Sequence, residues 1–76
     1  MKVLIRDKTR KLYLAPGDKW VSEVENGRDF QTGIAAVAHA RALRSADVDL
    51  FHVFPNAQYN FGIPFEAYDA SPDGAT

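Results

Sequence analysis

Short apolar runs separated by turn signals predict three strands in the first third of the chain. Residues 2–6 are rich in β-branched and aliphatic side chains, residues 11–15 alternate leucines with Tyr13, and residues 19–24 alternate again. Asp7 opens the first turn because its side chain can bond the backbone two residues further on. A Pro-Gly pair makes the second turn. Such short connections cannot hold parallel crossovers, so we expect an antiparallel meander.

The spacing of the apolar residues then changes to that of a helix. Residues 32–44 are rich in alanine, the best helix former, and Thr32 is expected to cap their N-terminus, with Asp29 as the alternative cap. Ile34 and Ala38 point away from the apolar stripe, so the predicted amphipathicity is weak. The small residues on the stripe predict a helix that lies close to the sheet. At 100° per residue, the stripe consists of Gly33, Ala36, Val37, Ala40 and Leu43.

Two more strands are predicted after the helix. Residues 48–54 carry large apolar groups on both faces, which is typical of a central strand. Residues 59–66 alternate apolar with polar or small side chains, but Pro64 cannot donate to a ladder, so this strand belongs at an edge. The β-β-β-α-β-β order predicts an α+β domain over residues 1–66, with one helix on one face of a small antiparallel sheet. Residues 67–76 are predicted to be a flexible acidic tail.

Composition narrows the class of protein further. The chain has 76 residues, of which 46% are hydrophobic and 25% charged, as in one small globular domain with a modest core. No apolar run approaches the roughly 20 residues of a membrane span, and no secretory leader pattern is visible. We therefore expect a cytoplasmic protein with no membrane partner. The absence of cysteine excludes disulfides, thiolate catalysis and thiolate-bound metals.

Several of these features follow one another in an order that resembles a loose group of small bacterial proteins. That order is Tyr13-Leu14, Trp20, Phe30-Gln31-Thr32, the alanine-rich helix, and Val48 to Phe54. The likeness spans roughly residues 10–65. Proteins of this group have a short β-meander, one helix and a returning strand, and they have no assigned activity. The resemblance implies a bacterial cytoplasmic protein and points to no pair of catalytic residues.

Candidate chemistry is sparse. His39 and His52 show no metal-ligand spacing, and a metal site would need three or four converging ligands. No serine lies in a Gly-x-Ser-x-Gly turn, and no glycines form a phosphate-binding loop. Two carboxylate pairs occur at i, i+2 spacing, but a solvated strand end explains them better than a catalytic dyad does: Glu23/Glu25 and Asp47/Asp49. We therefore expect a non-enzyme with no catalytic residue, metal or cofactor, although protonation of His52 near pH 6.5 would matter on an apolar face.

Charge is divided unevenly along the chain. Residues 1–20 carry +4 and residues 21–76 carry −5, which could steer a charged partner or favour head-to-tail association, or could reflect solvated turns. Basic side chains flank Tyr13 and Trp20, as in sheets that stack bases. The pI of about 6.0 is low for a nucleic-acid-binding domain, so weak single-stranded nucleic-acid binding is only the alternative function. This basic patch would comprise Lys2, Arg6, Lys8, Arg10 and Lys11.

Aromatic residues are the strongest functional signal. Nine of the 76 residues are Phe, Tyr or Trp, and one helix can shield only one face of the predicted sheet. Exposed rings would mark an interaction surface, and an unpaired edge would invite strand addition, unless the last strand folds back over the open face. We therefore predict a protein-interaction module that self-associates or binds a protein partner through the open sheet face or an edge strand. The candidate partner-binding residues are Tyr13, Trp20, Phe51, Tyr59 and Phe61.

Overall fold

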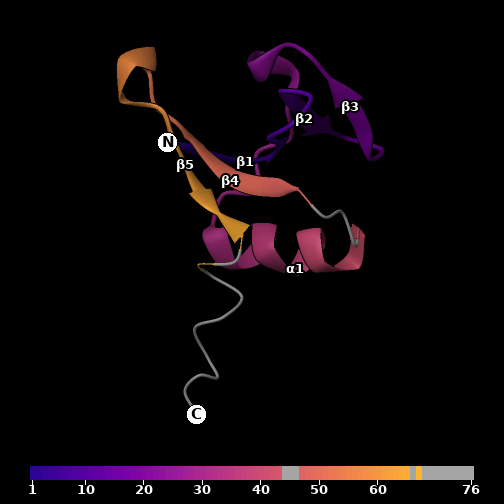
Figure 1. The fold of residues 1–76 in the computed structure, drawn as a ribbon. Coiled ribbons are helices and arrows are strands. Elements are labelled where there is room, and N and C mark those ends of the chain that lie inside the picture. The colour runs from indigo at the N-terminus through magenta and orange to yellow at the C-terminus, as the bar shows by residue number, and fades with distance from the viewer. Residues whose placement is uncertain (44–46, 66, 68–76) are drawn as a thin grey trace.

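Five strands form one antiparallel sheet, and a single helix lies against one of its faces (Figure 1). The computed structural model describes residues 1–43, 47–65 and 67. The strand order across the sheet is β3-β2-β1-β4-β5, which confirms the predicted α+β class. In chain order the elements are β1 (Lys2–Asp7), β2 (Leu12–Ala15), β3 (Lys19–Val21), the 3-10 turn η1 (Val24–Asn26), α1 (Gly33–Leu43), β4 (Val48–Val53), the 3-10 turn η2 (Ala57–Tyr59) and β5 (Phe61–Pro64).

The predicted elements are confirmed, with differences at their ends. The third strand stops at Val21 because the chain turns into η1 instead of continuing to residue 24. The fifth strand begins at Phe61, and Tyr59 lies in η2. β4 pairs with a strand on each side, and Pro64 ends an edge strand, as expected. The predicted tail, apart from residue 67, lies outside the described residues.

The core lies between α1 and the two strands at the centre of the sheet. β1 contributes Val3 and Ile5, and β4 contributes Val48 and Leu50. From the helix, the three buried residues belong to the predicted stripe, and their small side chains let the helix approach the sheet closely: Ala36, Val37 and Ala40.

Thr32 caps the helix, as predicted. Its hydroxyl oxygen accepts a hydrogen bond from the Ala35 N–H at 3.1 Å, which satisfies one of the free donors of the first turn. Asp29, the alternative cap, has a different role. Its Oδ1 accepts from the N–H groups of Val3, at 3.0 Å, and Gln31, at 2.8 Å, so this carboxylate ties the approach to the helix to the first strand.

The segment that leads into the helix, residues 27–30, is bonded to two strands at once. The Arg28 N–H donates to the Leu14 carbonyl of β2, and the Phe30 N–H donates to the Val3 carbonyl of β1, each at 2.8 Å. β1 and β2 pair with each other only next to the turn that joins them, where Arg6 and Asp7 lie opposite Tyr13 and Leu12. We call residues 27–30 the connector, because it supplies the backbone partners that β1 and β2 lack where they no longer pair.

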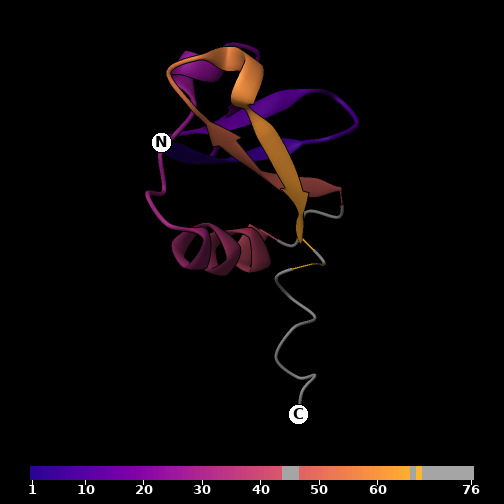
Figure 2. The ribbon, with the colours of Figure 1, turned by 90° about the vertical axis from the view of Figure 1, so that its left-hand side faces the viewer.

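The connector and η1 also cover part of the sheet face opposite the helix, here called the far face. Leu4 points to this face and is nonetheless fully buried. Gly27 packs on it so closely that a Cβ at this position would lie 2.9 Å from Leu4 Cδ1. η1 lies on the side of the sheet away from α1 (Figures 1 and 2). The last strand does not fold back over the far face, because β5 pairs with β4 in the sheet.

No helix within the described ranges has both the length and the apolar character needed to cross a membrane.

Replacing Phe30 tests the importance of the connector. Its ring is buried in the core, so Phe30→Ala should lower the free energy of unfolding by about 3 kcal/mol or more, measured by urea denaturation. Phe30→Leu keeps most of the apolar volume and should cost clearly less. Equal, small losses for both variants would show that the connector does not anchor the fold.

Candidate interaction surface

The centre of the far face is occupied by an ion pair. Arg6 and Asp49 are direct cross-strand neighbours on β1 and β4. The Arg6 guanidinium donates from Nε to Asp49 Oδ1 at 3.0 Å and from Nη2 to Oδ2 at 2.5 Å, and the Asp49 residue is only 4% exposed. The hydrogen bonds to Asp49 raise the pKa of Arg6. The guanidinium also lies 4.3 Å from the centroid of the Phe51 ring, so its charge is engaged on two sides.

The ion pair extends over β5 because that strand has a glycine beside it. Gly62 lies opposite Phe51 in the β4–β5 register. A Cβ at Gly62 would lie 2.8 Å from Arg6 Nη2 and would collide with the Asp49 carboxylate. The missing side chain therefore leaves the space that the pair fills. A charged, tightly bonded group at this place makes the middle of the far face a poor apolar docking site.

The structure does not gather the five candidate aromatic residues on one surface. The rings of Tyr13 and Phe51 lie on the far face with their centroids 5.7 Å apart, and both residues are half-buried. Trp20 is opposite Leu14 in the register, packs against the core on the helix side, and has the Arg10 guanidinium 5.5 Å from its ring. The two remaining residues, Tyr59 and Phe61, lie elsewhere, at the connection between β4 and β5.

The five predicted basic residues do not form one patch either. Lys2 is separated from the β1–β2 turn by the length of β1, about 20 Å at roughly 3.3 Å per residue. Of the others, three form ion pairs: Arg6 with Asp49, Lys8 with Asp47 at 3.7 Å, and Arg10 with Asp7 at 2.8 Å. Only Lys2 and Lys11 of the five form no ion pair with the described residues.

Asp7 organises the turn between β1 and β2. Its carboxylate accepts from the backbone N–H groups of Thr9 and Arg10 and from the Arg10 side chain. These hydrogen bonds, led by the Arg10 backbone N–H, lower the pKa of Asp7 below its usual value of 3.8. Thr9 also donates from its hydroxyl to Asp47. Arg10 thus binds Asp7 and stabilises the β1–β2 turn.

The two histidines lie apart from each other and have structural contacts. His52 is 7% exposed, stacks on the Phe61 ring with centroids 4.7 Å apart, and has its Nδ1 3.2 Å from the Leu50 carbonyl. The Nε2 of His39 lies 2.8 Å from Asp18 Oδ1, which links α1 to the β2–β3 turn. Within residues 1–43, 47–65 and 67, no three His, Asp or Glu side chains come together in a metal-binding arrangement.

Exposed apolar side chains gather where β4 turns into β5. The large hydrophobic residues exposed in the described part of the chain are Ile34 at 82%, Met1 at 64%, Tyr59 at 60% and Phe61 at 45%. All but Ile34 belong to this end of the sheet. The Phe61 ring stacks on Phe54 with centroids 6.0 Å apart. We call residues 1–2 and 53–61 the hairpin end.

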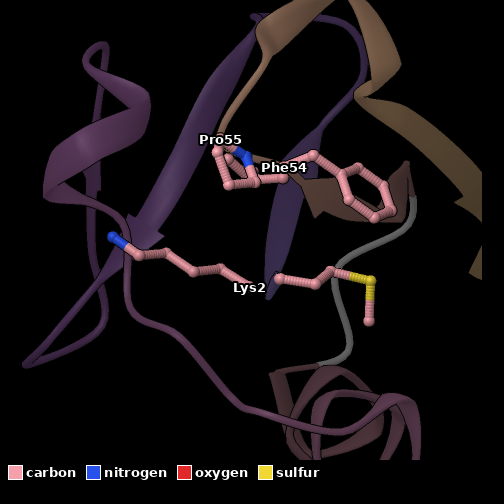
Figure 3. Close-up of a pocket in the computed structure, with 5 residues that line it drawn as sticks. Lys2, Phe54 and Pro55 are labelled. Atoms are coloured by element: carbon pink, nitrogen blue, oxygen red, sulfur yellow. The ribbon is translucent and has the colours of Figure 1, made fainter.

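A pocket of about 240 Å³ opens in the hairpin end (Figure 3). It lies between the start of the chain, Met1 and the first residue of β1, and the end of β4 with the two residues that follow, and it is mostly apolar. The sequence predicts Tyr59 and Phe61 as partner-binding residues but does not predict the pocket. One signal was present, because residues 50–65 contain no Asp, Glu, Lys or Arg. The pocket is lined by Met1, Lys2, Val53, Phe54 and Pro55.

The hydrogen-bonding pattern of the sheet determines which backbone groups of β5 point outward, where a partner strand could bind. Val3 uses its N–H and its carbonyl on the connector, so these groups point away from β4. Its cross-strand partner His52 must then direct its backbone groups towards β5, where it faces Phe61. Backbone groups alternate along a strand. The outward positions of β5 are therefore Gly62 and Pro64, and proline has no N–H.

Both edges of the sheet are consequently poor sites for strand addition. β5 presents a single outward N–H, from Gly62. β3 has only three residues and begins with a lysine, a feature that protects natural edge strands. An interaction through this sheet would have to use side chains, and the hairpin end is where apolar side chains are exposed.

Comparisons with family models, curated proteins and solved structures find no match to this chain. The resemblance to small bacterial proteins therefore stays a prediction.

The pKa of Asp7 leads to a prediction of pH dependence. A carboxyl with a lowered folded-state pKa contributes stability above its unfolded value near 3.8, and loses that contribution as the pH falls through the folded value. The unfolding free energy of the wild-type chain should thus fall more than that of Asp7→Asn when the pH is lowered from 6 to 2.5, as followed by urea denaturation. Parallel pH profiles for the two chains would contradict this assignment.

Pro64 is expected to protect the β5 edge. Pro64→Val adds an outward N–H beside that of Gly62 and should increase strand-mediated aggregation several-fold, measured by thioflavin T fluorescence and light scattering. Ile63→Val is the matched control, because the backbone of residue 63 faces β4 and the substitution adds no outward donor. If Pro64→Val aggregates no faster than this control, the edge is protected by something else.

Proposed function

We propose that the protein is a non-enzymatic interaction module of the cytoplasm that self-associates through the hairpin end. The observation that carries the proposal is that three of the four large hydrophobic side chains exposed in the described part of the chain belong to the hairpin end, which also holds an apolar pocket. Interfaces are depleted in charge and rich in aromatic residues and Met, which is the composition of the hairpin end.

A second copy of the chain is the partner that suits the charge of this surface. Lys2 is the only charged side chain among residues 1–2 and 53–61, and the α-ammonium group of Met1 is the one further charge, so two such surfaces bring few like charges together. The net charge of the whole chain is −1, and long-range repulsion between copies is correspondingly small. An isologous dimer, in which the same patch is used twice, needs this kind of self-compatibility.

The size of the surface predicts a weak dimer. A standard interface takes about 800 Å² from each partner, which is roughly a sixth of the 4668 Å² accessible surface of the chain. The hairpin end contains 11 of the 76 residues, slightly less than that share. We therefore expect a dissociation constant in the micromolar range, about −8 kcal/mol or weaker.

The other surfaces considered from the sequence support association less well. The far face carries the Arg6–Asp49 ion pair, and both edges of the sheet are poor sites for strand addition. Ion pairs within the chain engage Arg6, Lys8 and Arg10. This leaves less free positive charge for the alternative function, weak binding of single-stranded nucleic acid, and less charge asymmetry for head-to-tail association.

Size-exclusion chromatography with light scattering tests the proposal over about 1–500 µM protein. The wild-type chain should shift from monomer to dimer with increasing concentration. Tyr59→Ser should weaken the dimer roughly tenfold or more, because exposed aromatic residues are typical energetic centres of interfaces.

Ile34→Ser is the matched control, because it removes an even more exposed apolar side chain from the helix and should leave association unchanged. A chain that stays monomeric up to 500 µM would exclude self-association. Equal effects of the two substitutions would exclude the hairpin end as its site.

A further inference from the structure

The pocket of the hairpin end has the size of a site for one side chain. Its volume of about 240 Å³ exceeds that of a few water molecules, at about 30 Å³ each, and is below the roughly 300–1,000 Å³ of pockets that hold larger ligands. A single aromatic ring is the largest common protein group that fits this range.

The lining of the pocket favours an aromatic ring. Met1 contributes a thioether, Phe54 an aromatic ring, and Pro55 a rigid apolar surface (Figure 3). Sulfur–aromatic and ring–ring contacts are both favourable. Lys2 also lines the pocket, and its ammonium group has no ion-pair partner among the described residues. Such a cation is able to lie over the face of a ring or to donate to a phenolic oxygen.

A suitable ring is exposed in η2, the turn that follows the pocket residues Phe54 and Pro55 along the chain. Tyr59 is 60% exposed and is not one of the pocket's own lining residues. Its turn is held in shape by Asn56, whose side chain accepts from the Gln58 N–H and whose carbonyl accepts from the Tyr59 N–H at 3.0 Å. Presenting a ring from an already ordered turn lowers the entropy lost on binding.

The turn that holds the ring is joined to the pocket by a hydrogen bond. Asn60, next to Tyr59, accepts through Oδ1 from the N–H of Phe54, a pocket residue, at 2.7 Å. The hairpin end thus carries both an exposed ring and a pocket, and this bond ties the turn that holds the ring to the pocket residue Phe54. A two-fold axis between two such surfaces lets each ring enter the opposite pocket, so that both contacts form together.

We propose that the protein dimerises by reciprocal insertion of Tyr59 into the pocket of a second copy. This inference rests on the proposed self-association and specifies its geometry. Each dimer contains two identical ring–pocket contacts. A variant without the ring keeps its pocket, and a variant with a filled pocket keeps its ring.

Mixing two variants tests this geometry directly. Tyr59→Ala removes the ring, and Val53→Phe fills the pocket. Each variant alone should dimerise at least tenfold more weakly than the wild-type chain in sedimentation velocity, because no ring–pocket contact remains. An equimolar mixture should associate more tightly than either variant alone, because the Tyr59 ring of the filled-pocket chain enters the intact pocket of the other.

Two controls make the result specific. A mixture of Tyr59→Ala with Tyr59→Ala/Ile34→Ser lacks both rings and should show no recovery. Lys2→Trp, at an exposed position, is a second pocket-filling variant in case Val53→Phe perturbs the strand, and far-UV circular dichroism confirms that each variant is folded.

The outcomes separate the two proposals. A wild-type chain that never dimerises overturns both the self-association and the insertion. A wild-type chain that dimerises while Tyr59→Ala dimerises equally well, or a mixture without recovery, overturns the insertion alone. Recovery only in the mixture that retains one ring and one open pocket supports reciprocal insertion.

Discussion

The fold depends on the bonding of the connector to two strands that have stopped pairing with each other. Through Arg28 and Phe30, residues 27–30 donate to the Leu14 and Val3 carbonyls, and Asp29 accepts from Val3. Buried backbone groups must find partners, and here they find them in a segment without regular structure. The same few residues place Phe30 in the core on one side of the sheet and Gly27 against Leu4 on the other. The connector therefore helps to cover both faces of the sheet, although the chain has only one helix in its described part.

The far face therefore differs from the open apolar surface that the aromatic content suggests. Packing of the connector hides Leu4, the ion pair occupies the centre, and the rings of Tyr13 and Phe51 are half-buried beside it. Removing one partner of such a buried pair would leave an uncompensated charge, which is strongly destabilising. The charges here restrict where another molecule can dock, and the apolar exposure is concentrated instead at the hairpin end.

Local periodicity predicts the elements of this chain well, because each depends on neighbours in sequence. The stripe through Ala36, Val37 and Ala40 follows from the helical repeat, and the edge position of β5 follows from the chemistry of Pro64. The arrangement of the site depends on register instead. That Gly62 must be small follows only once Arg6 and Asp49 are known to meet across β1 and β4. No sequence period marks residues 27–30, so their bonding to two strands could not be predicted.

The central position of β1 has a consequence for how the chain assembles. Its hairpin neighbour β2 follows within a few residues, but its other neighbour, β4, begins only at Val48. Pairing over such a sequence separation closes a long loop and is intrinsically slow. During synthesis, β1 leaves the ribosome before β4 does, and it lacks one of its two neighbouring strands until residues 48–53 have emerged. The middle of this small domain is therefore completed late.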